Sequence, residues 1–264
     1  MNRYFSVLAI ALSACTLFLS FRSQQFSETL IDDHQVRSLS IGQGPISVVF
    51  ESGFGSPLGV WSRVQPEVAE FASTISYDRA GTGLSEKSSI PRDGENIAIE
   101  LRELLASSGL PPPYILVGHS LGGLYVRVFA GSFPDLVAGI LLVDPTMNPE
   151  WAGRFGDSEL PELASLRATI EQAEASLLSP NIRVVLIDAL GQPQVPFASA
   201  SIGREMTETQ SSEVRQDSAE YSEWLQRIGH GELIATNSSG HNVPIEQPAL
   251  IVNTIRRMAQ FISD

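Results

Sequence analysis

Several features that indicate other kinds of protein are scarce in this sequence. It contains one cysteine, Cys15, so no disulfide forms within a single chain. Basic residues number 17 against 30 acidic ones, the net charge is −13, and no run of Lys and Arg occurs. Because nucleic-acid binding needs clustered positive charge, we expect no nucleic-acid partner. The side chains that bind metals do not cluster with ligand spacing, so we expect no metal and no other cofactor.

The remaining composition is that of a folded protein. Hydrophobic residues make up 43% of the 264 residues and charged residues 18%. A chain of this length and composition buries the core of one large domain. No segment repeats at a fixed period, which argues against a repeat architecture.

Residues 1–25 have the pattern of a targeting segment. Arg3 is followed by a run without charge from Tyr4 to Phe21, which is typical of an export signal or a membrane anchor. The stretch Leu12–Cys15 also resembles a bacterial lipoprotein signal, although the residues after it stay apolar. We expect a periplasmic or secreted protein, either released or held by a membrane or lipid anchor. Membrane contact is expected through this segment only.

From residue 26 onward, short apolar runs alternate with longer amphipathic ones. This order is typical of an α/β fold: a mostly parallel sheet of about eight strands with helices on both faces. The first two strands are expected to be neighbours, joined by a turn at Gly42–Pro45. The expected strands are Val36–Ile41, Ile46–Phe50, Thr74–Tyr77, Tyr114–Val117, Gly139–Val143, Arg183–Ile187 and Leu233–Thr236. The expected helices are Val60–Phe71, Glu95–Ser107, Leu121–Ala130, Pro161–Leu178, Thr207–Ile228 and Pro248–Ile262.

Two connections are long for such a fold, at about 145–180 and 191–231 in the domain spanning 26–264. Long insertions after strands commonly form lids or substrate walls, so we expect a small helical lid here. The alternative is two additional surface helices. The same two interpretations apply to the large aromatic side chains in these segments, which either line an apolar cavity or pack the helices. They are Trp151, Phe155, Phe197 and Trp224.

The motif Gly118-His119-Ser120-Leu121-Gly122 joins an expected strand directly to an expected helix. A turn this tight forces its middle residue into a strained conformation, and the flanking glycines leave room for it. Ser120 then projects above the sheet edge. The N–H of Leu121 lies at the helix start, where an anion is favoured. This is the geometry of an acyl-transfer nucleophile.

In this context the chain resembles the α/β-hydrolase fold superfamily, close to its serine esterase, lipase and aminopeptidase-like members. The resemblance covers about residues 36–262. It implies a hydrolase with a catalytic triad in the chain order nucleophile, acid, histidine. A serine at neutral pH needs a base, and His241 follows the last expected strand at the same sheet edge as Ser120. His241 is therefore the expected general base. His34 and His230 are expected at the surface and His119 as a packing residue.

The triad acid has two candidates, because Asp144 and Asp188 both end expected strands between Ser120 and His241. In most members of the superfamily the acid lies a few residues beyond the later strand, where this chain has Gln192. Some members place it after the earlier strand, which suits Asp144. We favour Asp144 and retain Asp188 as its rival. The carboxylate would fix the histidine tautomer and stabilise its charged form.

The oxyanion hole needs two N–H donors. Leu121 is the first, and Phe54, in the loop Ser52-Gly53-Phe54 after an earlier strand, is the expected second. The stretch Tyr77–Ser85 resembles the superfamily's D-x-x-G-x-G-x-S loop. Its role is expected to be structural, with Asp78 and Arg79 making local hydrogen bonds.

These residues predict a serine hydrolase that cleaves a carboxylic ester of a small acyl substrate through an acyl-enzyme on Ser120. An amide or a lactone is a less favoured substrate. An acyltransferase that uses the same acyl-enzyme is the first alternative function. A catalytically silent binding protein on the same scaffold is the second.

Overall fold

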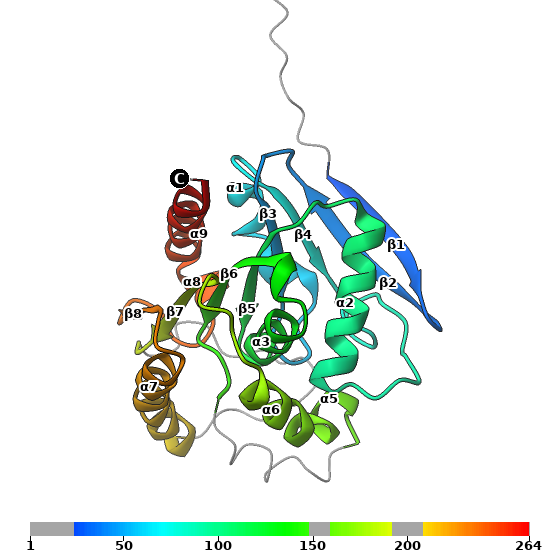
Figure 1. Cartoon of the computed structure of the whole chain (residues 1–264). Helices are drawn as coiled ribbons and strands as arrows, with labels where there is room; N and C mark the ends of the chain where they lie inside the picture. The colour runs from blue at the N-terminus through cyan, green and yellow to red at the C-terminus, as the bar shows by residue number, and fades with distance from the viewer. Residues whose placement is uncertain (1–23, 148–158, 192–207, 264) are drawn as a thin grey trace, which may run out of the picture.

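An eight-stranded sheet forms the centre of the computed structural model, which describes residues 24–147, 159–191 and 208–263 (Figure 1). The expected targeting segment lies almost entirely outside these residues. The sheet order is β1-β2-β4-β3-β5-β6-β7-β8. Only β2 runs against its neighbours, so the sheet is mostly parallel, as predicted. The strands are β1 (Gln25–Ile31), β2 (His34–Ile41), β3 (Ser47–Glu51), β4 (Ser73–Tyr77), β5 (Tyr114–His119), β6 (Val137–Val143), β7 (Arg183–Ala189) and β8 (Glu232–Thr236).

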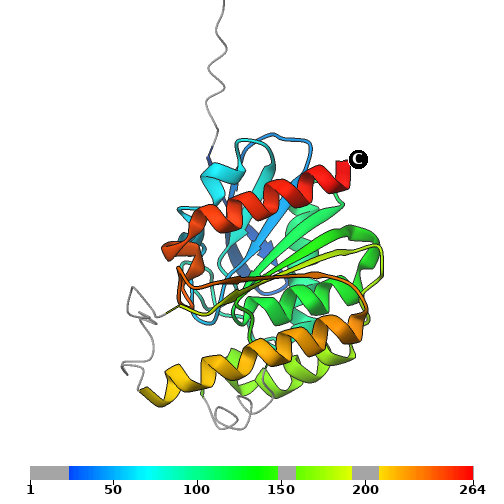
Figure 2. The ribbon, with the colours of Figure 1, turned by 90° about the vertical axis from the view of Figure 1, so that its left-hand side faces the viewer.

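Helices cover both faces of this sheet. Figure 2 shows α9 on one side of the sheet and α3 and α7 on the other. Each layer closes over its own buried apolar cluster, one with α2, α3, α6 and α7 and the other with α1 and α9. The helices are α1 (Gln65–Val68), α2 (Gly94–Ser108), α3 (Gly122–Ser132), α5 (Pro161–Ala164), α6 (Leu166–Ala175), α7 (Glu208–Ile228), α8 (Val243–Glu246) and α9 (Pro248–Ser263), with 3₁₀ turns η1 (Leu58–Trp61) and η2 (Pro134–Leu136).

The sequence of α2 explains both of its ends. The side chain of Asp93 accepts hydrogen bonds from the N–H groups of Glu95 and Asn96, which caps the first turn. Gly109 ends the helix in the left-handed conformation with φ of 73°. Between these ends, an apolar stripe that includes Ile97 and Leu101 is buried against the sheet, so the amphipathic pattern predicts this helix almost to the residue.

The prediction that the first two expected strands are neighbours is wrong. β2 pairs with β1 on one side and with β4 on the other, so β4 separates β2 from β3. The sequence does not predict β1, because its apolar residues do not alternate clearly with polar ones. Its Phe26 and Leu30 are exposed. β1 forms a hairpin with β2 around Asp32, which has a positive φ of 48°. His34 follows this turn and is buried rather than at the surface.

The expected helix at residues 60–71 is also shorter than predicted. Its place is taken by η1 and α1, which are separate short turns. The apolar spacing is still used, because Trp61, Val64 and Val68 are buried against the face that α9 covers. Within the described residues, no helix is long and apolar enough to cross a membrane.

The two long connections contribute helices to the apolar layer on one face of the sheet. α6 lies against α2 and α3, with Leu166 and Ile170 buried in their apolar cluster. α7 lies against β7 and β8, with Tyr221 and Trp224 buried in the same cluster. Residues 148–158 and 192–207, with Trp151, Phe155 and Phe197, lie outside the described residues. The lid at these connections therefore stays a prediction.

Candidate active site

Ser120 occupies the sharp turn between β5 and α3. Its φ of 53° lies in the left-handed region, which is rare for a residue with a side chain. A Cβ atom on Gly118 would lie 2.6 Å from the carbonyl oxygen of Gly122, and one on Gly122 would lie 2.5 Å from the carbonyl oxygen of Glu51. Both contacts are too close for any larger residue. The two glycines of the motif thus let the turn close and let its serine adopt this conformation.

His241 lies in the loop after β8 and contacts two of the predicted site residues. Its Nε2 is 2.9 Å from Oγ of Ser120, and its Nδ1 is 2.6 Å from Oδ2 of Asp144. Because a carboxylate only accepts hydrogen bonds, Nδ1 carries the proton and the lone pair of Nε2 faces the serine hydroxyl. The N–H of Gly240 donates to Oε2 of Glu246 at 2.7 Å, which holds the loop beside α8.

Asp144 is fixed by the strands on either side of it. Its backbone, with φ of 44°, leaves β6 in the left-handed conformation. The N–H of Asp144 donates to the carbonyl oxygen of Ile187 at 2.8 Å, and its Oδ1 accepts from the N–H of Ala189 at 3.0 Å. One carboxylate oxygen is therefore held by β7 while the other is directed at His241. The structure brings Ser120, His241 and Asp144 into one hydrogen-bonded chain.

Asp188 does not join this chain. It lies within β7, where its backbone pairs with Ala235 of β8, and its side chain is buried. Burial raises the pKa of Asp188, the hydroxyl of Ser218 in α7 lowers it, and the negative charge of Asp144 raises it further. A carboxyl whose charged form is disfavoured is poorly suited to stabilise an imidazolium. Geometry and electrostatics thus both favour the earlier aspartate.

His119 contributes more than the packing role that the sequence suggests. Its Nε2 lies 2.8 Å from the carbonyl oxygen of His241, and the two ring centroids are 4.9 Å apart. Burial, together with the positive charge of a protonated His241, lowers the pKa of His119 to about 3. The ring is neutral, and its Nε2–H donates to the His241 backbone. No pattern in the sequence indicates this contact, because the two residues are 122 positions apart.

The loop after β3 lies against the nucleophile. A Cβ atom on Gly53 would be 3.2 Å from Cβ of Ser120, so the backbone of this loop passes directly beside the serine. Ser52 anchors the loop by accepting a hydrogen bond from Nε1 of the buried Trp61 at 3.0 Å. In the part of the chain that the structure describes, the N–H groups of Phe54 and Leu121 donate to no other group. Both predicted oxyanion donors are thus unused.

The side chains that the structure describes contain no group of three or more His, Cys, Asp or Glu placed to hold a metal ion. Trp224, one of the aromatics from the long connections, is 5% exposed and packs over the guanidinium of Arg127 at 4.8 Å. It belongs to the apolar layer beside the sheet.

Comparison with known proteins agrees with this architecture. The family model described as the alpha/beta hydrolase family matches residues 48–254. The chain belongs to the alpha/beta hydrolase family. Among the curated relatives of this family member, the uncharacterized protein YqjL of Bacillus subtilis is 24% identical over 210 residues, which cover 80% of this chain and 82% of YqjL. The (lyso)-N-acylphosphatidylethanolamine lipase of Bos taurus is 32% identical over 102 residues, which cover 37% of this chain but only 30% of the lipase.

Solved structures show the same fold for this hydrolase-family chain. Cfl2 of Burkholderia cenocepacia superimposes with a TM-score of 0.65 at 16% identity, covering 88% of this chain and 94% of that one. Identity this low reports shared architecture. The family and the fold together support a hydrolase.

Proposed function

We propose that the protein is a serine hydrolase that cleaves a carboxylic ester through an acyl-enzyme on Ser120. The observation that carries the proposal is the chain of two hydrogen bonds from Ser120 through His241 to Asp144, at 2.9 and 2.6 Å. Ser120 and Asp144 follow the ends of the adjacent strands β5 and β6, and His241 reaches both from the loop after β8. A serine that is activated by an adjacent base is a nucleophile for acyl transfer.

In the proposed reaction, Oγ of Ser120 forms a bond to the ester carbonyl carbon while Nε2 of His241 accepts the hydroxyl proton. Asp144 stabilises the resulting imidazolium and keeps Nδ1 protonated. The negative charge on the carbonyl oxygen is held by the N–H groups of Leu121 and Phe54. The C–O bond to the alcohol then breaks, and His241 returns the proton to the leaving oxygen. Water then attacks the acyl-enzyme carbonyl while His241 accepts its proton. The bond to Oγ of Ser120 breaks, His241 returns the proton to Oγ, and the acid is released.

A fluorophosphonate probe tests the nucleophile directly. We expect stoichiometric labelling of Ser120 and hydrolysis of short-chain p-nitrophenyl esters, with both lost in Ser120→Ala. Ser108→Ala, a serine at the end of α2, is the matched control and should be labelled like the native protein. A folded native protein that is neither labelled nor active would overturn the proposal and favour a silent binding protein. Product analysis with an added alcohol or amine acceptor separates hydrolysis from acyl transfer.

We also propose that the N-terminal segment directs export of the protein. The segment is then either cleaved, which releases the protein, or kept as a membrane or lipid anchor. The support is the uncharged run Tyr4–Phe21 after Arg3. Fractionation of cells that express the full chain tests this. Recovery from the cytoplasmic fraction with an intact N-terminus would overturn it, and extraction that requires detergent would indicate an anchor.

A further inference from the structure

Arg79 is a buried cation beside the loop that carries Phe54. It follows β4, and its side chain is 1% exposed. Nη1 donates to the carbonyl oxygen of Ser52 at 2.6 Å, and Nη2 donates to that of Gly53 at 2.9 Å. The sequence predicts only local hydrogen bonds for Arg79, yet these partners lie 26 and 27 positions away. Arg79 therefore fixes the backbone of the loop after β3 through two of its carbonyl oxygens.

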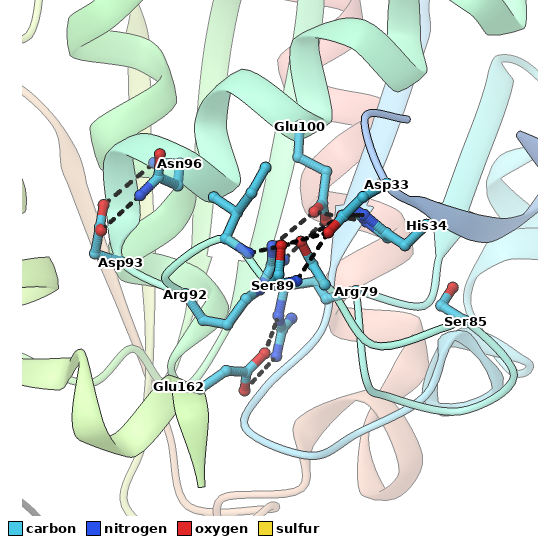
Figure 3. A network of polar contacts seen from close by, with 12 residues as sticks. Asp33, His34, Arg79, Ser85, Ser89, Arg92, Asp93, Asn96, Glu100 and Glu162 are labelled. Carbon is cyan, nitrogen blue, oxygen red and sulfur yellow. Dashed lines mark hydrogen bonds and ion pairs between the residues drawn. The ribbon is translucent and has the colours of Figure 1, made fainter. Parts of the chain in front are cut away.

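Two carboxylates complete the coordination of this guanidinium. Nη1 also donates to Oε1 of Glu51 at 2.6 Å. Glu162 of α5 accepts from Nε at 2.7 Å and from Nη2 at 3.1 Å, as Figure 3 shows. A guanidinium has five N–H donors, and all five are used here. Because every donor is occupied, the orientation of Arg79 is fixed from three elements of the fold.

The hydrogen bond to Gly53 determines the direction of another group. The carbonyl of Gly53 and the N–H of Phe54 belong to one planar trans peptide, so they point in opposite directions. A carbonyl held toward Arg79 directs the Phe54 N–H away from it, and the Gly53 backbone lies beside Ser120. A rotated peptide would bring its carbonyl oxygen to the side where an oxyanion has to be stabilised. Arg79 opposes this rotation with a charged donor in a buried setting, where such hydrogen bonds are strong.

The charge on Arg79 is secured by its surroundings. Burial lowers the pKa of Arg79, but the carboxylates of Glu162 and Glu51 more than offset this and keep the pKa well above its usual value. The guanidinium also lies over the ring of Tyr125 of α3, 5.0 Å from its centroid. The guanidinium therefore stays charged.

We propose that Arg79 is a positioning residue of the oxyanion hole: it orients the Gly53–Phe54 peptide so that the Phe54 N–H faces the reacting carbonyl at Ser120. This inference rests on the proposed function. It assigns to the loop at Tyr77–Ser85 a role in the reaction, although Arg79 itself touches no reacting atom. Through Glu162, α5 also supports the same donor.

A matched pair of arginines provides the test. Arg92 is also buried and also makes a two-pronged ion pair, at 2.7 and 2.9 Å, with Glu100 (Figure 3). It makes no hydrogen bond to the loop after β3. Arg79→Met and Arg92→Met therefore remove similar buried ion pairs. Only Arg79→Met removes the charged donor from the Gly53 carbonyl, which then keeps a single neutral hydrogen bond, from the N–H of Ser56 at 3.2 Å. Active sites are counted with the fluorophosphonate probe, so that kcat refers to folded, titrated enzyme.

We expect kcat of Arg79→Met to fall about 100-fold, the loss typical of one oxyanion donor, with KM changed less than about threefold. The Ki of a trifluoromethyl ketone, whose tetrahedral adduct carries an oxyanion, should rise by about the factor that kcat falls. Arg79→Lys should recover part of both. Arg92→Met should leave kcat and the ratio of Ki to KM unchanged.

Arg79→Met leaves the buried carboxylates of Glu51 and Glu162 without their cation, which destabilises the fold. A second variant therefore separates this effect from the loss of the positioning hydrogen bond. Arg79→Met combined with Glu51→Gln and Glu162→Gln leaves no unpaired charge in this cluster, and Arg92→Met with Glu100→Gln is its control. The inference is overturned if either Arg79 variant keeps native kcat per titrated site, or loses kcat without a rise in the ratio of Ki to KM. If the native protein itself is neither labelled nor active, the proposed function falls with it, and the two failures are distinct.

Discussion

Asp144 and Asp188 lie at the ends of neighbouring strands, yet only Asp144 reaches His241. The difference lies in the backbone. Asp144 has left β6 in the left-handed conformation, with φ of 44°, so its side chain is turned to the sheet edge. Asp188 is still within β7 and pairs with β8, which directs its side chain into the layer covered by α7. Two identical side chains thus have different environments because β6 ends at Val143, level with Ile187, whereas β7 continues for two further residues to Ala189.

The strand ends that reach His241 are those at which the backbone departs from the sheet. Ser120, with φ of 53°, and Asp144 both depart in the same left-handed manner, and their strands are adjacent. The N–H of Ser120 donates to the carbonyl oxygen of Val143, so the two turns are also bonded to each other. Such strained backbone is retained only where surrounding structure supports it, which is common at functional sites.

The largest expected difference between the two aspartates is in catalysis. Asp144→Asn cannot hold the Nδ1–H tautomer of His241, so kcat for an ester should fall about 10³- to 10⁴-fold. Asp188→Asn should change kcat less than threefold. Steady-state kinetics on both variants measures this. The opposite ranking would move the role of the acid to Asp188.

The second difference concerns stability. Asp144→Ala places a residue without a polar side chain at positive φ and leaves the Ala189 N–H without its partner. We expect Asp144→Ala to unfold with about 2 kcal/mol less free energy than Asp144→Asn. At position 188, where the backbone is extended, the Ala and Asn variants should differ less. Urea unfolding of the four variants compares them, and equal differences at both positions would contradict the role of the left-handed turn.

Asp144 shares the positioning of His241 with His119, whose Nε2 lies 2.8 Å from the His241 carbonyl oxygen. His119→Leu removes the N–H that donates to the His241 carbonyl, and we expect kcat to fall about tenfold. His119→Gln retains an amide donor and should retain most of the activity. If both variants match the native enzyme, the histidine loop depends on Asp144 and on the Glu246 contact instead.

The smallest effect is a change in the pH dependence of stability. The pKa of Asp188 is raised above its ordinary value of 3.8, so the folded state binds this proton more tightly than the unfolded state does. The stability linked to Asp188 is complete below that value and is lost as pH rises through the folded pKa. Asp188→Asn removes this loss. Its free energy of unfolding, relative to the native protein, should therefore increase from pH 4 to pH 8.

The control for this measurement is the exposed Asp135→Asn, whose unfolding free energy should follow the native curve. Urea titrations at several pH values provide the data. Parallel curves for Asp188→Asn and the native protein would show that folding does not shift the pKa of this carboxyl, contrary to the prediction.

Much of the fold can be predicted from the sequence. The alternation of apolar runs predicts the parallel strands β4 to β8 and the helices α2, α3 and α9 within a few residues, because most of the strands are short buried apolar runs and the helices carry apolar residues at helical spacing. β1 and its pairing with β2 are missed, since Phe26 and Leu30 remain exposed and the strand depends on its partner for hydrogen bonds. The segment at 60–71 is over-extended, because helical spacing also suits two short turns.

The local chemistry of the site was already present in the chain. Gly118 and Gly122 around Ser120 require a tight strand-to-helix turn, and the order of Ser120, two aspartates and His241 places the candidates at one sheet edge. Folding determined three further contacts. They are the choice of Asp144 as the partner of His241, the hydrogen bond from His119 to the His241 backbone, and the bond of Arg79 to the peptide that precedes Phe54. Those choices involve residues 97 to 122 positions apart for the histidine and 26 for Arg79, whose distances depend on strand order and register. Periodicity describes each element separately, and contacts between elements exist only once the sheet has assembled.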